Sequence, residues 1–448
     1  MAATAARTGR AVRDENQAQL VRAVAASALA TTITWYDFFL YGFAATLVFG
    51  RLFFPTGNAF ASSLLALTTY LGGFAARPVG AMLFGHLGDR IGRRATLMAT
   101  LLLLGLATPL IGVAPTYAQA GVLGGIILLL LRLVQGLAVG GEWGGSVLLS
   151  LEWNHRGRRG LLGSWTQLGL PAGLGLAYAS LQLFTAWMGP DQGWRYPFLI
   201  SVVLLVVAVY LRLGVRETPV FTGLLASRRI EVAPVREVTV RQWRDVALAA
   251  LLRVGQQTPF YVFTVFVVTY ATGTLKLHQS DVLTAVMIAA GVSVLTVLAF
   301  GFLSDVVGRR RLVMIGAAVM VLWSYPYFLA LDTRMPLLVM LAIVVSLPIH
   351  DLQSAPQAAM IAESFSGRWR YSGASLGYQL TCLIADGPAP LIAVALLQAF
   401  GGPLPVAIYL AVCALISLLA AFAMRDRSRQ DMSVEYDEAP VAAPALRA

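Results

Sequence analysis

The sequence has little charge and few cysteines. Only 12% of its 448 residues are charged, about half of the roughly 25% found in soluble globular chains. The two cysteines, Cys382 and Cys413, both lie in apolar runs, which excludes a disulfide framework and a cysteine-rich metal cluster. Hydrophobic residues make up 58% of the chain, and the mean hydropathy is +0.73. This composition predicts an integral membrane protein.

The net charge of +11 needs its own explanation, because a basic protein can also bind nucleic acid. Lys276 is the only lysine, so arginine supplies nearly all of the basic residues. These arginines cluster in every second gap between apolar runs. Cytoplasmic loops of membrane proteins have this excess of basic residues. We therefore expect a lipid bilayer as the partner of the surface, and no nucleic acid.

Apolar runs long enough to span a bilayer recur along the chain, since a membrane helix needs about 20 such residues. They predict an all-α integral membrane protein with twelve transmembrane helices. The expected spans are residues 23–49, 59–84, 95–114, 118–150, 160–187, 195–214, 246–272, 281–304, 311–331, 336–361, 370–398 and 404–424.

The basic residues also predict the topology. If the N-terminus and every even-numbered loop face the cytoplasm, 26 of the 33 basic residues lie on that side and four on the other. We therefore expect a multi-pass protein of the cell membrane with both termini in the cytoplasm. The arginine-rich gap at 215–245 divides the chain in two. The expected organisation is a cytoplasmic N-terminal tail (1–22), a six-helix bundle (23–214), a cytoplasmic central loop (215–245), a second six-helix bundle (246–424) and a cytoplasmic C-terminal tail (425–448).

The two bundles are internal repeats. The stretch "GHLGDRIGRR", which begins at Gly85, matches "GFLSDVVGRR", which begins at Gly301, with an offset of 216 positions. A second correspondence follows at an offset of 211, where Glu152 and Arg159 match Glu363 and Arg370. Two parallel six-helix halves with a site between them are typical of secondary transporters.

The same stretches carry a family resemblance. Residues 85–94 resemble the loop motif of the major facilitator superfamily. The stretches "WYDFFLYG" (35–42), "RLVQGLAVGGEWGG" (132–145) and "RYSGASLGYQL" (370–380) resemble its metabolite:proton symporter branch. That branch carries organic acids such as shikimate, 2-oxoglutarate and citrate, and also proline and betaine, with protons. The resemblance covers roughly residues 22–424, and it implies a transporter that functions as a monomer.

The resemblance implies that the loop motif is a gate. In the superfamily the motif aspartate pairs across the two halves when the inner gate is shut, although the motif's arginines also suit a role as topology anchors alone. The residues expected to act in gating are Gly85, Asp89, Arg90, Gly92, Arg93 and Arg94 in the first half, and Asp305, Gly308, Arg309 and Arg310 in the second.

Charged residues also occur within the predicted spans. A charge at the bilayer centre costs about 2.5–3.5 kcal/mol on insertion scales, so it should face a cavity or a partner. Arg132 is the best candidate for an anion anchor, because a guanidinium stays charged and forks onto a carboxylate. Arg253 lies 216 positions after Asp37, which suggests that this acid and base pair in the empty carrier. The candidate substrate-binding residues are Tyr36, Asp37, Tyr41, Arg132, Gln135, Arg253, Gln256, Gln257, Tyr261, Gln357, Tyr378 and Gln379.

Two departures from the family pattern concern the proton. The branch usually has a glutamate where this chain has Thr34, and another where it has Gln256. Acidic groups and a histidine instead stand where the branch is mostly apolar or glycine. We therefore expect proton coupling to involve Asp37, Glu142, His350, Asp351 and Asp386. Weaker coupling, or none, is the alternative.

Other functions fit less well. "GASLG" (373–377) matches the G-x-S-x-G pattern of hydrolases, but it opens a predicted helix and lacks the strand–turn–helix setting that this chemistry needs. No zinc-protease motif and no P-loop are present, so we expect no enzyme, no metal and no cofactor. We expect proton-coupled uptake of a small carboxylate-bearing metabolite. The alternatives are an exporter of a natural product or drug, and a substrate sensor on the same scaffold.

Overall fold

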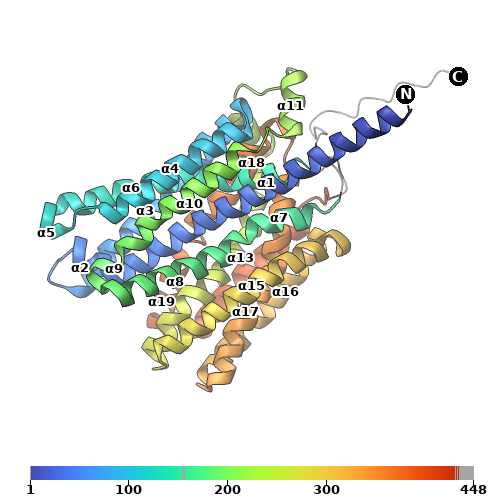
Figure 1. Ribbon diagram of the computed structural model, residues 1–448. Helices are drawn as coiled ribbons and strands as arrows, with labels where there is room; N and C mark the ends of the chain where they lie inside the picture. The colour runs from blue at the N-terminus through green and yellow to red at the C-terminus, as the bar shows by residue number, and fades with distance from the viewer. Residues whose placement is uncertain (1, 154–156, 429, 431, 433–448) are drawn as a thin grey trace.

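The computed structural model describes residues 2–153, 157–428, 430 and 432. It is all-helical, with no strand among those residues. Long helices run side by side, and Figure 1 shows the N-terminal helices (blue to green) as one layer and the later helices α15, α16 and α17 (yellow to orange) as a second layer beneath it.

The first half of the chain begins with a single long span. Helix α1 (Ala2–Ala44) continues through the π-helix η1 (Ala45–Phe49) into α2 (Gly50–Phe53). Residues 2–22, which were expected to form a tail, are therefore helical. The other helices of this half are α3 (Ala59–Ile91), α4 (Arg93–Val113), α5 (Tyr117–Ala120), α6 (Val122–Leu151), α7 (Arg159–Gln167), α8 (Gly169–Met188), α9 (Pro190–Gly193) and α10 (Arg195–Leu213).

The gap predicted between the halves contains two short helices, α11 (Pro219–Ala226) and α12 (Pro234–Arg241), each with proline at its start, where no backbone donor is lost. The second half consists of α13 (Trp243–Tyr261), η2 (Val262–Phe266), α14 (Val267–Thr269), η3 (Tyr270–Thr274), α15 (Gln279–Val307), α16 (Arg309–Asp332), α17 (Pro336–Glu363), η4 (Gly367–Trp369), α18 (Arg370–Gln379), η5 (Leu380–Leu383), α19 (Pro388–Phe400) and α20 (Leu404–Ala423).

The predicted twelve-helix architecture is confirmed, and the predicted spans coincide with these helices to within a few residues at most ends. By length and hydropathy alone, ten helices of the described chain are apolar enough to cross a membrane. The other two spans are α3 and the segment from α13 to η3. Both carry buried polar residues, including Arg77 in α3 and Arg253 in α13, which become important below.

The α-helical geometry is interrupted in two spans of the second half. After Pro259 the seventh span passes through two π-helical turns, η2 and η3. The eleventh span leaves the α-helix at Leu380, and its α-helix resumes at Pro388. Irregular backbone inside a membrane protein is tolerated where it packs on protein or lines a cavity. Asp386 lies in the second interruption.

Glycines allow the closest helix contacts. Gly136 and Gly140 of α6 lie directly against the backbone of α3, at Gly73 and Arg77. Gly144 continues this stripe but faces Ser375 of α18, in the other half of the chain. This glycine stripe of α6 therefore serves packing, both within a half and between halves.

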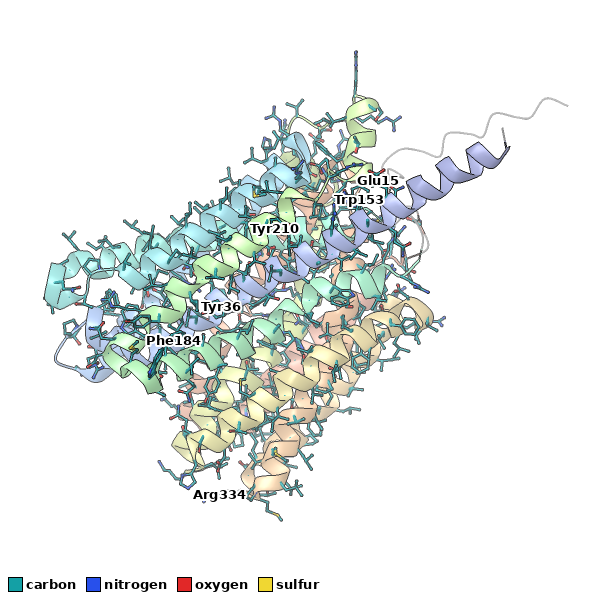
Figure 2. The ribbon with its side chains drawn as sticks, viewed as in Figure 1. Glu15, Tyr36, Trp153, Phe184, Tyr210 and Arg334 are labelled. Carbon is teal, nitrogen blue, oxygen red and sulfur yellow. The ribbon has the colours of Figure 1, made fainter. Side chains whose placement is uncertain are left out.

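The two halves contact each other mainly at one end of the molecule. There α18 packs on α3 and α6, and α7 packs on α15 and α17. We call this end the arginine-rich face, defined by Arg93, Arg159, Arg309 and Arg370, all of which are buried. Figure 2 shows Glu15 near this end and Arg334 at the opposite one.

Candidate functional site

Five charged side chains of the membrane spans gather where the two halves meet. They are Asp37, Arg77 and Arg132 from the first half, and Arg253 and Asp386 from the second. None of these side chains is more than 4% exposed. We call this set the central cluster. Buried charges require partners, and the central cluster supplies them in two groups.

The first group surrounds Asp37 of α1. Thr108 and Gln135 donate hydrogen bonds to its Oδ1 over 2.8 and 2.6 Å, and Arg132 lies 3.5 Å from its Oδ2. The Arg132 guanidinium also lies over the rings of Tyr41 and Tyr70, 4.4 and 5.1 Å from their centroids. Arg132 reaches this position because residue 73 is glycine: a Cβ there would lie 2.6 Å from its Nε. The aspartate is thus neutralised within its own half.

The second group connects the halves. Asp386 lies 3.3 Å from Arg253 of α13 and 3.7 Å from Arg77 of α3. The Arg77 guanidinium lies 4.6 Å from the ring centroids of Phe38 and Phe74, which are favourable cation–π distances. One carboxylate is therefore shared between arginines from opposite halves.

Aromatic side chains also connect the two halves beside the central cluster. The Arg253 guanidinium lies 3.5 Å from the ring centroid of Tyr378. The ring of Trp143, from the first half, stacks on the same Tyr378 ring, with centroids 3.5 Å apart and planes inclined by 16°. Gln379 donates to the carbonyl of Val139 over 3.1 Å. These contacts join α18 to α6 beside the central cluster.

The pairing of Asp37 with Arg253 that the repeat offset suggested is wrong for this structure. Asp37 pairs with Arg132, and Arg253 pairs with Asp386. Equivalent positions in two repeats need not face each other, because each helix packs against its own neighbours.

Glu142 has its own counter-ion. Arg212 of α10 lies 3.3 Å from its Oε1, Ser146 donates to the same oxygen, and Thr34 donates to Oε2 over 3.4 Å. The residue that replaces the family's glutamate, Thr34, therefore contacts another glutamate. Arg212 is a buried residue at the end of α10.

His350 and Asp351 form a chain within the second half. His350 Nδ1 lies 2.9 Å from Asp351 Oδ1, its Nε2 contacts the Gln256 amide, and Thr296 of α15 donates to Asp351. All four side chains belong to α13, α15 or α17. This chain is separate from the ion pairs of the central cluster.

The remaining candidates differ in their surroundings. Tyr36, labelled in Figure 2, donates to the carbonyl of Pro197, which also belongs to the first half. Gln357 donates weakly to Leu252 O over 3.5 Å. Tyr261 Oη and Gln257 Nε2 are buried and have no hydrogen-bond partner in the part of the chain that the structure describes.

The two motif aspartates cap helices of the opposite half. Asp89 accepts hydrogen bonds from the backbone amides of Tyr371 and Ser372, over 3.1 and 2.9 Å, at the start of α18. Asp305 accepts from Gly160 and Leu161, over 2.8 and 3.0 Å, at the start of α7. A carboxylate at a helix N-terminus is favoured by the free amides and by the helix dipole.

Two glutamates complete this symmetry. Glu152 lies 3.4 Å from Arg93 of its own half and 3.6 Å from Arg370 of the other. Its repeat equivalent, Glu363, contacts Arg309 of its own half and lies 3.0 Å from Arg159 of the other. The second correspondence in the sequence thus marks the second pair of contacts between the halves.

The other motif residues have local roles. Arg90 contacts His86, Arg94 donates to Leu213 O, and Arg310 donates to Ala421 O, each within one half. Gly92 and Gly308 begin α4 and α16 with φ of +109° and +102°, which favour glycine. Gly85 allows a close approach, since a Cβ there would lie 2.8 Å from Ser372 Cα.

The C-terminal segment crosses the arginine-rich face. Arg159 donates to the carbonyl of Gln430 over 2.8 Å, and Arg370 donates to that of Met432 over 2.8 Å. The Met432 side chain is buried in a cluster that includes Trp143 and Phe365. The described residues of this segment, 425–428, 430 and 432, thus contact an equivalent arginine from each half.

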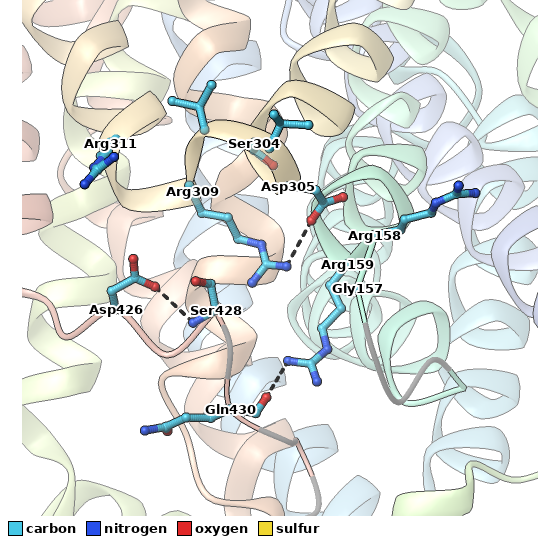
Figure 3. Close-up of a pocket in the computed structure, with 13 residues that line it drawn as sticks. Gly157, Arg158, Arg159, Ser304, Asp305, Arg309, Arg311, Asp426, Ser428 and Gln430 are labelled. Atoms are coloured by element: carbon cyan, nitrogen blue, oxygen red, sulfur yellow. Dashed lines mark hydrogen bonds and ion pairs between the residues drawn. The ribbon is translucent and has the colours of Figure 1, made fainter.

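A cavity of about 1000 Å³ lies under this segment (Figure 3). It is lined by Arg159, Asp305 and Arg309, and by Asp426 and Ser428 of the C-terminal segment. Burial would raise the pKa of Asp426, but hydrogen bonds from Ser428 and the nearby Arg309 and Arg310 outweigh it and lower that pKa. The cavity belongs to the contact between the halves.

Two site residues were missed by sequence reasoning. Arg77 lies within the predicted span 59–84, in the stretch "ARPVG", and was not among the residues assigned to the site. Cys382 lies in an apolar run, but its thiol lies 3.2 Å from Asp386 Oδ2. No group of three potential metal ligands occurs in the described ranges, and Ser375 lies inside α18 rather than at a strand–helix turn.

Comparisons with known proteins agree with one another. Residues 27–385 match the family model described as Major Facilitator Superfamily. The shikimate transporter of Escherichia coli (strain K12) is 37% identical over 91% of this chain and 95% of its own. The inner membrane metabolite transport protein YhjE of the same organism is 35% identical over 92% and 95%.

More distant matches extend the same pattern. The proline/betaine transporter of Salmonella typhimurium (strain LT2) is 28% identical over 92% of this chain and 85% of its own. Among solved structures, the proton:xylose symporter XylE bound to 6-bromo-6-deoxy-D-glucose superposes with a TM-score of 0.73 over 93% of this chain and 98% of that one, at 16% identity. At that identity the likeness concerns the fold alone.

Proposed function

The chain belongs to the major facilitator superfamily, and on that premise we propose that it takes up a small carboxylate-bearing metabolite together with protons, by alternating access. The family and the named relatives make it a multi-pass membrane transporter and not an enzyme. The nature of the solute, the coupling to protons and the direction of transport are the content of the proposal.

The observation that carries the proposal is the central cluster. Its five charges come from both halves, and Asp386 joins them through Arg77 and Arg253. Helices that rock against each other must break and remake such contacts. Guanidinium groups bind carboxylates through charge-assisted hydrogen bonds. A carboxylate on the solute therefore competes with Asp386 for the same arginines.

The relatives support the choice of solute. One is named as a transporter of shikimate, which has one carboxylate, and others as transporters of proline and betaine, which are zwitterions. Around the central cluster we assign the first-half residues Tyr41 and Gln135, and the second-half residues Tyr261 and Tyr378, to the substrate site. Arg132 belongs to it as the partner of Asp37.

Proton coupling is assigned to carboxylates whose counter-ion can be exchanged. Asp386 exchanges its arginines as the two halves move apart, and a carboxylate buried without a counter-ion takes up a proton. Asp37 and Glu142 have the same relation to Arg132 and Arg212. The His350–Asp351 chain is a further candidate route for the proton.

The arginine-rich face is proposed as the cytoplasmic gate. Asp89 and Asp305 cap helices of the opposite half, so the gate opens only when both caps are released. This orientation places both termini in the cytoplasm of the cell. We propose that one chain suffices for transport, because both halves of the site come from the same polypeptide.

The test is uptake by proteoliposomes that contain the purified protein. Labelled shikimate, 2-oxoglutarate, citrate, proline and betaine are each offered with and without an imposed pH gradient, acidic outside. We expect accumulation of at least one of them that requires the gradient, and none in protein-free liposomes.

The other results would contradict the proposal in distinct ways. Accumulation that is unchanged when the gradient is collapsed removes proton coupling. Movement driven only in the opposite orientation indicates an exporter. Binding of a solute without any flux indicates a sensor on a transporter scaffold.

A further inference from the structure

The central cluster carries an excess of positive charge. It contains three arginines, Arg77, Arg132 and Arg253, but only two carboxylates, Asp37 and Asp386. The next acid along α6, Glu142, is paired with Arg212. Among the described residues that form these ion pairs, the cluster therefore has a net charge of +1.

This excess is located at Asp386 rather than at Asp37. Arg132 has one carboxylate of its own and lies over two tyrosine rings. Arg77 and Arg253 instead share the single carboxylate of Asp386, at 3.7 and 3.3 Å. Charge-assisted hydrogen bonds of good geometry measure about 2.7–2.9 Å. Arg253 makes three contacts of 3.3 Å with the two oxygens of Asp386, whereas Arg77 has one contact of 3.7 Å, so Arg77 is the more loosely held of the two.

Unsatisfied polar atoms lie on the same side of α13. Arg253, Gln257 and Tyr261 are spaced by four residues, so they share one face of this helix. At one end of this face Arg253 contacts Asp386, and at the other the Tyr261 ring lies 6.3 Å from that of Phe74, in the first half. Arg253 Nε, Gln257 Nε2 and Tyr261 Oη are buried donors without a hydrogen-bond partner in the described structure.

From this geometry we infer that the substrate carboxylate binds between Arg77 and Arg253, displacing Asp386, and that the site selects solutes with a single net carboxylate charge. The inference rests on the proposed function and specifies its substrate class. While Asp386 stays ionised, one carboxylate brings the cluster to neutrality. A second would leave an uncompensated charge in a buried site, which is costly. Gln257 and Tyr261 donate hydrogen bonds to hydroxyl or other acceptor groups of the solute.

The role of Arg77 follows from its position. It is the first-half member of the pair, so a carboxylate that it shares with Arg253 ties the two halves together. Asp386 holds the same two arginines in the absence of substrate. Substrate and Asp386 are therefore alternative occupants of one site, and Asp386 sets how much negative charge that site accepts.

The test is equilibrium binding by titration calorimetry on purified protein in detergent. The probes are shikimate, 2-oxoglutarate and citrate, and shikimate methyl ester, which lacks the charge. We expect the wild type to bind shikimate at least about tenfold more tightly than the other three probes, because one charged hydrogen bond contributes about 1.5–3 kcal/mol.

Variants test the assignment of charge. Arg77→Gln should weaken that binding by about tenfold or more, whereas Arg51→Gln, an exposed arginine of α2, should leave it unchanged. Arg77→Lys, which keeps the charge, should lose less than Arg77→Gln. Asp386→Asn adds one unit of positive charge, so its preference should shift towards 2-oxoglutarate. Thermal unfolding of each variant shows that it is folded.

Each contrary result is decisive. Equal or tighter binding of 2-oxoglutarate or citrate by the wild type would overturn the inference, and so would an unchanged preference in Asp386→Asn. If proteoliposomes nevertheless accumulate a dicarboxylate with protons, the proposed function stands without this selectivity. Failure of the folded wild type to bind any probe overturns both.

Discussion

At the scale of single residues, Asp37 shows what a carboxylate within a span requires. Its two oxygens receive a guanidinium, an amide and a hydroxyl, from α6 and α4. The sequence predicted that such a group would have a partner, because an isolated charge in the bilayer is costly. It indicated Arg253 as the partner where the structure has Arg132, since both were available and only the packing of α1 against α6 decides between them.

Removing one member of this pair should cost more than removing both. Arg132→Gln leaves a buried carboxylate without a counter-ion, and we expect it to lower the free energy of unfolding by about 3–5 kcal/mol. The double variant Arg132→Gln with Asp37→Asn should recover most of this loss. Thermal unfolding in detergent measures both. A double variant as unstable as the single one would show that the pair does not balance charge.

At the scale of helices, the glycine stripe of α6 gives a matched pair of substitutions. Gly140 lies against α3, where a Cβ would meet Arg77 O and lie 2.7 Å from Ala81 N, whereas nothing lies within 4 Å of a Cβ at Gly291 of α15. We expect Gly140→Ala to be destabilising by about 1–3 kcal/mol, because backbone cannot yield. Gly291→Ala should be neutral or stabilising, since alanine favours helices. Equal unfolding temperatures would contradict this account.

Helices were also the scale at which the sequence was most informative. Apolar length located all twelve spans, and the repeats located both motif aspartates and both glutamates of the arginine-rich face. The interruption at Leu380 was not located, although Pro388 and Pro390 lie within the predicted span 370–398. Proline limits local helix geometry, but where the backbone leaves the helix depends on the neighbours that accept its free groups.

At the scale of the whole molecule, the caps on α7 and α18 should hold the two halves together at the arginine-rich face. Asp89→Asn keeps the shape of the side chain but removes the charge that the helix dipole favours. With Ser375→Cys as a reporter, buried between α18 and α6, we expect labelling by a water-soluble maleimide to rise by up to about tenfold, for a loss of about 1.4 kcal/mol.

The control for this experiment is Asp191→Asn, an exposed acid that contacts Arg51, which should leave the labelling rate unchanged. The parent protein with only Cys382 and Cys413, both buried, gives the background. An Asp89→Asn variant that labels no faster than the control would show that the cap does not hold this face closed.

The C-terminal segment should contribute to the same closure. Met432→Glu places a charge in an apolar cluster that both halves form, which is unfavourable. We expect faster labelling of the Ser375→Cys reporter than in the parent. Gln430→Glu adds the same charge two residues away on an exposed side chain, and should have no effect. Equal labelling rates of the two variants would mean that the segment does not contribute to closure of the arginine-rich face.

This arrangement has a practical consequence for anyone who handles the protein. The carbonyls of Gln430 and Met432 accept hydrogen bonds from Arg159 and Arg370. If an affinity tag or fluorescent protein replaces the residues that follow α20, both acceptors are lost. A truncation made to help crystals grow would do the same. Expression designs that retain residues 425–432 and attach the fusion beyond them leave these arginines satisfied.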